Sequence, residues 1–231
     1  MLLIRSLLFN FAMYAVMVVM GLIGAIPAIL SKDAAYWVMT RYSRIVVWLL
    51  RVIVGAKLEV RGEIPQGECI IASKHQSFLD ILILMALLPR AKFVMKKSVK
   101  WMPIVGFYAM QIGCAPVDRR SAGAINTMLE SVAEQRSDPG QIVIYPQGTR
   151  VAPGVKARYK RGAAAMYANF ALPCVPAATN AGVCWGRNTV LRHPVVVVMH
   201  FLPEIPVGLS PVDFLARLEA EIEPASNALL S

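Results

Sequence analysis

The sequence predicts an α/β fold, with a mostly parallel central sheet flanked by helices and with N-terminal membrane-associated helices. Short runs rich in β-branched residues alternate with helical stretches after residue 54, which is the pattern of parallel sheets. Several runs, such as Ile142–Tyr145, are continuously apolar, as in strands covered on both faces. Before them, Ser6–Ser31 contains no Asp, Glu, Lys or Arg. We therefore expect residues 1–55 to form a membrane-associated helical segment and residues 56–231 to form an α/β domain.

The composition excludes a disordered chain. Of the 231 residues, 57% are hydrophobic and 16% are charged, against about 45–50% and about 25% in average soluble proteins. Only one long uncharged run is present, which argues against a polytopic transporter. The four cysteines lack C-x-x-C and zinc-site spacing, so we expect free thiols in a reducing, cytoplasm-facing location. Nothing in the sequence signals a metal or a redox cofactor.

The first predicted element is the uncharged run, which is long enough to cross a bilayer. At about 1.5 Å per residue it reaches roughly 39 Å, against about 30 Å of hydrocarbon core. Gly21, Gly24 and Pro27 also allow it to turn back as a hairpin within one leaflet, and both arrangements stay open. Arg5 alone precedes the run, whereas six cations follow it up to Arg61. The positive-inside rule therefore puts the domain on the cytoplasmic face of the cell (inner) membrane.

The second predicted element is a helix over Tyr36–Val54. Arg41, Arg44 and Arg51 form one narrow stripe on it at 100° per residue. Trp37 and Trp48 flank this stripe, and most other positions are apolar. A broad apolar face with basic and tryptophan side chains is typical of a helix that lies in the membrane interface.

The remaining elements follow in alternation. We expect strands at Lys57–Arg61, Cys69–Ser73, Lys92–Met95, Gln141–Tyr145, Pro173–Ala178 and Val195–Leu202, and helices at Ser77–Leu88, Ala122–Arg136, Lys160–Phe170 and Pro211–Glu223.

Positive charge is concentrated in residues 90–161. This segment holds 13 of the Lys and Arg residues against four acids, a net charge of +9 out of +10 for the chain. Such a patch suits phosphates, nucleic acid or anionic lipid. The apolar N-terminal region favours a phosphorylated lipid, and we expect no nucleic-acid partner.

His75 and Asp80 form the first candidate site. They lie where an apolar strand ends and a helix begins, which is where α/β sheets place their sites. A histidine oriented by a carboxylate is the pairing that a general base needs. Ser77 and Asp80 also match a capping box with Ser77 as N-cap, which explains those two residues without chemistry but does not explain His75.

Two further segments offer cations and a turn. In Tyr145–Arg150 a buried strand runs into a Pro-Gln-Gly-Thr-Arg turn, in which Gly148 permits close approach to a ligand and Arg150 can grip a phosphate. Lys96 and Arg119 come from two other strand or loop ends. Each segment by itself is equally consistent with solvated surface charge.

In this order and spacing, His-x4-Asp, a Lys-rich segment, Gly-x-x-x-Val-x-Arg, Pro-x-Gly-Thr-Arg and Val-Pro resemble the 1-acyl-sn-glycerol-3-phosphate (lysophosphatidate) acyltransferase family of the glycerolipid acyltransferase superfamily. The resemblance covers roughly Lys57–Pro206. It implies the glycerol-3-phosphate acyltransferase-like fold. It also implies transfer of a fatty acyl group from acyl-CoA or acyl carrier protein to the sn-2 hydroxyl of 1-acylglycerol-3-phosphate, a membrane lipid.

The resemblance also implies roles for single residues. His75 matches the base that deprotonates the acceptor hydroxyl, and Asp80 matches its orienting carboxylate. Three cations match the positions associated with the acceptor phosphate: Lys96, Arg119 and Arg150. The turn of the third motif is matched by Gln147, Gly148 and Thr149. Near Gly148 and Thr149, our own inference places backbone N–H donors for the oxyanion.

Three positions depart from the family pattern. Gln147 stands where Glu is usual, Lys74 where Asn is common, and Pro116 where Phe is usual. Gln147 carries no charge and therefore keeps other acceptors open, such as a lyso-ornithine lipid or glycerol-3-phosphate. A third alternative is a non-catalytic module that binds anionic lipid or nucleic acid through the basic segment.

Overall fold

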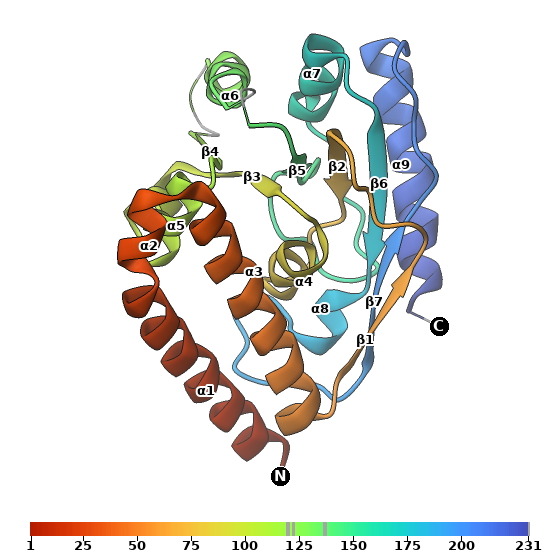
Figure 1. Cartoon of the computed structure of the whole chain (residues 1–231). Coiled ribbons are helices and arrows are strands. Elements are labelled where there is room, and N and C mark those ends of the chain that lie inside the picture. Colours follow the sequence, from red (N-terminus) through yellow and green to blue (C-terminus); the bar gives the residue numbers. More distant parts are fainter. Residues whose placement is uncertain (119–120, 122, 136–137, 231) are drawn as a thin grey trace.

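The first helices of the chain form an antiparallel pair that lies along one side of the molecule (Figure 1). The computed structural model describes residues 1–118, 121, 123–135 and 138–230. The two helices of the pair are α1 (Leu2–Ile23) and α3 (Lys32–Leu49), and the short α2 (Ala25–Leu30) joins them. A π-helical turn, η1 (Leu50–Val54), continues α3. The chain therefore turns back after α1, so that α3 packs beside it.

Small residues and a cap build this hairpin. A Cβ atom on Gly24 would lie 2.6 Å from Val38 Cγ2, so the close packing of the turn against α3 requires glycine there. Ser31 caps α3, because its side-chain oxygen accepts the Ala34 amide N–H at 3.4 Å. This cap starts α3 at Lys32, four residues before the predicted start at Tyr36.

The sheet has seven strands in the order β1-β7-β6-β2-β5-β3-β4. The strands are β1 (Lys57–Arg61), β2 (Cys69–Ser73), β3 (Ala91–Lys96), β4 (Ala115–Val117), β5 (Gln141–Ile144), β6 (Cys174–Thr179) and β7 (Val196–Phe201). All neighbouring strands pair in parallel except β6 and β7. The predicted mostly parallel α/β fold is confirmed.

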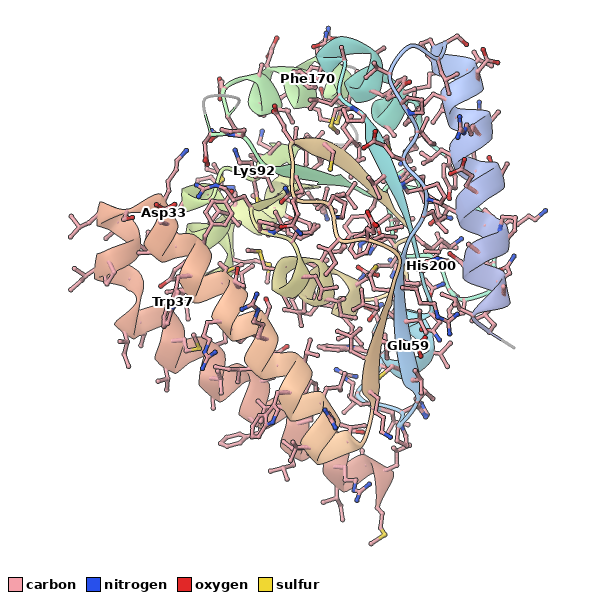
Figure 2. All side chains as sticks on the ribbon, turned by 45° about the vertical axis from the view of Figure 1, so that its right-hand side comes forward. Asp33, Trp37, Glu59, Lys92, Phe170 and His200 are labelled. Atoms are coloured by element: carbon pink, nitrogen blue, oxygen red, sulfur yellow. The ribbon has the colours of Figure 1, made fainter. Side chains whose placement is uncertain are left out.

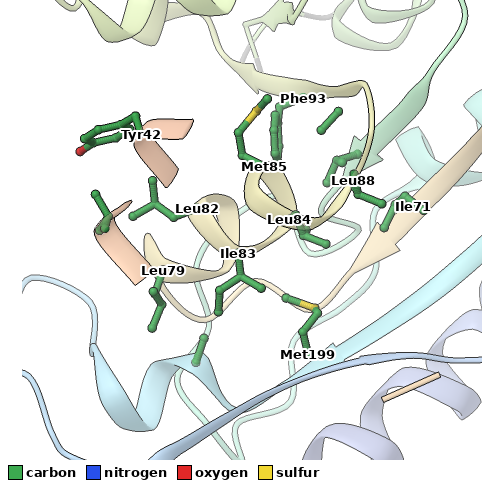
Figure 3. Packing of buried hydrophobic residues seen from close by; sticks show 14 of the residues in the cluster. Tyr42, Ile71, Leu79, Leu82, Ile83, Leu84, Met85, Leu88, Phe93 and Met199 are labelled. Atoms are coloured by element: carbon green, nitrogen blue, oxygen red, sulfur yellow. The ribbon is translucent and has the colours of Figure 1, made fainter. Parts of the chain in front are cut away.

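Helices cover both faces of this sheet. They are α4 (Leu79–Leu87), the 3₁₀ turn η2 (Lys97–Trp101), α5 (Val105–Gln111), α6 (Ala124–Ala133), α7 (Arg161–Phe170), α8 (Ala181–Cys184) and α9 (Pro211–Ala228). On one face, α4 packs with Tyr42, Ile71, Phe93 and Met199 (Figure 3). On the other face, α6, α7 and α9 enclose a second core that includes Ile70. Successive residues of β2 thus face opposite layers, as strand geometry requires.

The structure differs from the predicted elements in two ways. First, α4 begins at Leu79, two residues after the predicted start; the Ser77 hydroxyl donates to the Trp185 carbonyl and accepts the Leu79 amide, and Asp80 accepts the Ser77 amide, as in the expected capping box. Second, β4, η2, α5 and α8 have no counterpart among the predicted elements, because short segments show no clear hydrophobic period. All four cysteines are free, as expected, and all four are buried.

Candidate active site

The candidate site lies at the carboxyl ends of the parallel strands. His75 follows β2, the turn Gln147–Arg150 follows β5, and Lys96 ends β3. In the register of the sheet, Ala72 lies opposite Ile144, and Phe93 opposite Val143. The parallel topology therefore brings the three segments together at the carboxyl ends of neighbouring strands. Arg119, the remaining predicted cation, lies outside the described residues.

His75 and Asp80 are paired at hydrogen-bond distance. His75 Nδ1 lies 3.0 Å from Asp80 Oδ1, and the Asp80 side chain is fully buried. The other carboxylate oxygen, Oδ2, accepts the backbone N–H groups of Gln76 and Ser77, both at 2.8 Å. One carboxylate thus orients the imidazole and closes the turn before α4. With Nδ1 donating to Asp80, Nε2 becomes the nitrogen that can accept a proton.

Tyr145 fixes the plane of the imidazole. Its ring stacks on His75 with the ring centroids 3.8 Å apart and the planes 19° from parallel. Tyr145 directly follows β5 and is buried, and burial, then the Asp80 charge, raises the pKa of its hydroxyl well above the ordinary value. Tyr145 therefore stays neutral, and its ring restricts the orientation of the His75 imidazole by stacking on it.

The turn after β5 is tied to the histidine through the backbone. The Val151 amide donates to the His75 carbonyl at 2.8 Å, which holds the end of the turn beside the turn after β2. Gly148 has a φ of +68°, a left-handed conformation that favours glycine. Its own amide donates to the Tyr145 carbonyl at 2.8 Å. Of the two expected oxyanion donors, the Gly148 amide is therefore already engaged within the turn.

The predicted cations differ in their surroundings. Lys96 is exposed at the end of β3. Arg150 is half-buried and directly precedes Val151, whose amide donates to the His75 carbonyl. Sequence reasoning missed a fourth cation, Lys160. A Cβ atom built on Gly148 would lie 3.0–3.1 Å from the Cδ, Cε and Nζ atoms of Lys160, so this ammonium group lies directly over the turn.

Gln147 takes part in a buried cluster that the sequence did not reveal. Glu223, on α9, accepts hydrogen bonds from the turn after β2 and from the turn after β5. Lys74 Nζ lies 2.7 Å from each of its carboxylate oxygens, and Gln147 Nε2 donates to it at 3.1 Å. The Tyr159 hydroxyl donates to the same carboxylate at 3.0 Å. Glu223 is 149 residues from Lys74, so no local motif connects them. The available signal was a lysine directly after a buried strand, since a buried ammonium requires a carboxylate.

The described residues contain no group of three or more His, Cys, Asp or Glu side chains that could hold a metal ion. What the site offers is an oriented imidazole, a glycine-containing turn with backbone donors, and cations at one sheet edge. These groups are suited to removing a proton from a hydroxyl and to stabilising negative charge.

Comparisons with known proteins agree with this chemistry. A family model described as Acyltransferase matches residues 57–180. A 1-acyl-sn-glycerol-3-phosphate acyltransferase of Pseudomonas aeruginosa is 30% identical over 237 residues, which cover 96% of this chain and 92% of the relative. The 1-acyl-sn-glycerol-3-phosphate acyltransferase alpha of Homo sapiens is 30% identical over 138 residues, which cover 58% of this chain and 49% of the human protein.

A solved structure shares the fold. The crystal structure of the 1-acyl-sn-glycerophosphate acyltransferase PlsC from Thermotoga maritima matches with a TM-score of 0.82 at 18% sequence identity. The match covers 100% of this chain and 96% of that chain.

Proposed function

Because this chain belongs to the acyltransferase family, and within it to the 1-acyl-sn-glycerol-3-phosphate acyltransferases, we propose that it transfers a fatty acyl group to the sn-2 hydroxyl of lysophosphatidate. The product is phosphatidate, an intermediate of phospholipid biosynthesis. The acyl donor is a thioester, acyl-CoA or acyl carrier protein. The observation that carries the proposal is the His75–Asp80 pair beside a glycine-containing turn.

His75 is the general base of this reaction. Its Nε2 removes the proton of the acceptor hydroxyl while Asp80 stabilises the imidazolium that forms. The hydroxyl oxygen attacks the thioester carbonyl, and a tetrahedral oxyanion results. When the intermediate collapses, the C–S bond breaks and His75 returns the proton to the departing thiolate. The ester and the free thiol are the products, so atoms and protons balance.

The remaining groups stabilise the two negative charges of the reaction, the oxyanion and the acceptor phosphate. The Thr149 amide is the proposed donor to the oxyanion, since a preorganised N–H stabilises charge that develops in the transition state. Lys96, Arg119 and Arg150 bind the phosphate of the acceptor, and Lys160 adds a fourth cation at the turn. A phosphate that these groups hold would leave the acyl chain of the acceptor free to reach apolar surroundings.

The first helices are the proposed membrane-associated segment, residues 1–55. Among the described residues, α1 is the one helix that is long and apolar enough to cross a membrane. Most of its large apolar side chains are exposed: Leu3, Ile4, Leu7, Leu8, Phe11, Val18, Val19, Leu22 and Ile23. Figure 2 shows Trp37 on this helical pair, away from Glu59 and His200 of the β1–β7 edge.

The proposed placement is in one leaflet, with the domain on the cytoplasmic face of the inner membrane. Two buried residues of α1, Phe9 and Met13, pack in the same core as the sheet, so the helix lies along the domain instead of projecting from it. A surface hollow of about 330 Å³ beside α3 is lined by Trp37, Arg41 and Arg44, among others. These side chains are suited to the phosphate and glycerol region of a bilayer.

The test of the reaction uses purified protein in detergent. Labelled acyl-CoA and acyl carrier protein are offered with lysophosphatidate, lyso-ornithine lipid and glycerol-3-phosphate in parallel. We expect phosphatidate from the wild type, a loss of at least about 100-fold in His75→Ala, and no loss in His193→Ala, a loop histidine. Transfer to another acceptor alone would overturn the substrate. Transfer that survives in folded His75→Ala protein would overturn the mechanism.

The placement has its own test. Phe11→Lys puts a charge on the exposed face of α1, and Val212→Lys puts one on α9, where the side chain is similarly exposed (73% and 76%). We expect the first variant to lower the fraction of protein that sediments with lipid vesicles, and the second to leave it unchanged. Equal sedimentation of the two variants would contradict the placement.

A further inference from the structure

A buried polar cluster is formed by Lys74, Gln147, Tyr159 and Glu223. Lys74 directly precedes His75, and its side chain is 2% exposed. A buried ammonium group is tolerated only with a partner of opposite charge. Glu223 supplies that partner from α9, with 2.7 Å from Lys74 Nζ to each of its oxygens. The charge beside the proposed base is therefore balanced by a residue of the last helix.

Glu223 also connects the two turns of the candidate site. It accepts from Lys74, in the turn that carries His75, and from Gln147, in the turn that carries Arg150. Tyr159 donates to it as well, and burial, then the Glu223 charge, raises the pKa of that phenol and keeps it a donor. Three segments that meet only in the folded chain thus share one carboxylate.

Gln147 is the residue that this carboxylate requires. Its amide nitrogen faces Glu223 at 3.1 Å, and the side chain is buried. A carboxylate at position 147 would face the carboxylate of Glu223, with Lys74 as the one buried cation to balance both. The cluster is neutral with Gln147 and would carry a net charge of −1 with Glu. Like charges at such a distance in a buried site are strongly unfavourable.

We propose that Glu223 is a positioning residue that sets the place of His75 through Lys74 and the place of the Gln147–Arg150 turn through Gln147. On this basis residue 147 is Gln because the carboxylate of the cluster is located on α9, and not because the acceptor differs. The proposal rests on the proposed function for its assay, but it concerns geometry that any acceptor would need.

The experiment measures kcat and KM for acyl transfer in four variants. Glu223→Gln leaves Lys74 without its charge partner, and we expect kcat to fall at least tenfold while KM for lysophosphatidate stays within twofold. Gln147→Glu places two carboxylates against one lysine, and we expect a similar fall in kcat. The double variant Gln147→Glu/Glu223→Gln moves the carboxylate to position 147. We expect its kcat to return to within about threefold of the wild type.

A fourth variant separates positioning from folding. Lys74→Met/Gln147→Leu/Tyr159→Phe/Glu223→Leu replaces the buried ion pair and its two buried donors with apolar side chains, an exchange that often preserves stability. We expect this variant to unfold at a similar urea concentration to the wild type and to retain the tenfold loss in kcat. The proposal is overturned by wild-type kcat in this variant or in Glu223→Gln. It is also overturned by a folded double variant no more active than Glu223→Gln. Absence of transfer by the wild type would instead contradict the proposed function.

Discussion

At the scale of single residues, Asp80 performs two tasks with one carboxylate. One oxygen holds His75 Nδ1, and the other accepts the Gln76 and Ser77 amides. The pair was predictable from the sequence because its members are five residues apart at a strand–helix junction. The same short spacing suggested a capping box, and the structure contains both kinds of bond, since Ser77 Oγ accepts the Leu79 amide and Asp80 accepts the Ser77 amide.

Asp80→Asn separates the two tasks. The amide oxygen can still accept the two backbone N–H groups, so we expect the variant to stay folded. The NH₂ group then faces His75 Nδ1 as a donor, which leaves Nε2 protonated and unable to act as a base. We expect kcat to fall by about 100-fold or more, measured by acyl transfer at pH 7.5. Near-normal kcat would show that Asp80 is needed only for the turn.

The cluster around Glu223 marks the limit of sequence reasoning at this scale. Lys74 and Gln147 are visible in the sequence as departures from the family pattern, but they lie 73 residues apart and no local motif connects them. Their common partner lies on α9, and its contact with them depends on how that helix packs against the sheet. A side chain that acts over such a separation leaves no periodic or local signal in the sequence.

At the scale of elements, α1 is fastened to the domain by a polar contact inside an apolar surface. Arg192 donates to Asn10 Oδ1 of α1 at 2.9 Å, and its guanidinium stacks on Trp185 at 3.8 Å. Its backbone amide donates to the Ser6 hydroxyl at 2.9 Å. Burial lowers the pKa of Arg192 to about 10. An apolar helix with two inward polar residues is thus held in one register against the loop after α8.

Arg192→Met tests this attachment. The methionine keeps apolar contact with Trp185 but leaves Asn10 Oδ1 without its donor, while Asn10 Nδ2 keeps its bond to the Val190 carbonyl. We expect the free energy of unfolding to fall by about 1–3 kcal/mol, the cost of leaving a buried polar group unpaired. The measurement is urea unfolding in detergent. The control is Arg187→Met, an exposed arginine in the same loop, which should change stability by less than about 0.5 kcal/mol. Equal effects would contradict the attachment.

The elements that were predicted share a strong period or a long apolar run. The predicted strand Cys69–Ser73 has the bounds that the structure shows, and the Pro211 start of the last helix is also correct. By contrast, β4 is three residues long and contains Pro116, and α8 spans four residues. Such segments are strands or helices because their neighbours supply hydrogen bonds, so tertiary contacts and not local preference decide them.

At the scale of the whole molecule, the buried thiols predict alkaline instability. Burial raises the pKa of Cys69 and of Cys114 to about 12, and that of Cys184 to about 11, from an ordinary value of 9.0. Between these values the folded chain keeps protons that the unfolded chain loses. The stabilisation is therefore complete below pH 9 and is lost as pH rises toward 11–12. Each thiol contributes about 1.4 kcal/mol per pH unit in this window.

Urea unfolding at pH 8, 9 and 10 measures this loss. We expect the free energy of unfolding to fall by several kcal/mol between pH 9 and pH 10, because several thiols ionise together on unfolding. Cys184→Ala removes one of them and should reduce the slope by about 1.4 kcal/mol per pH unit. If the free energy of unfolding of the wild type did not change between pH 8 and pH 10, the thiols would ionise without unfolding the chain.

The fold-back of α1 through α2 into α3 has a consequence for the membrane as a whole. In the proposed placement, the enzyme takes its acceptor from the monolayer in which it is embedded and returns a two-chain lipid to that same monolayer. Synthesis therefore enlarges the area of one side of the bilayer only. The area of the other side can keep pace only if lipids cross the bilayer by another route, so growth of the membrane would depend on a lipid-translocating activity as well as on this enzyme.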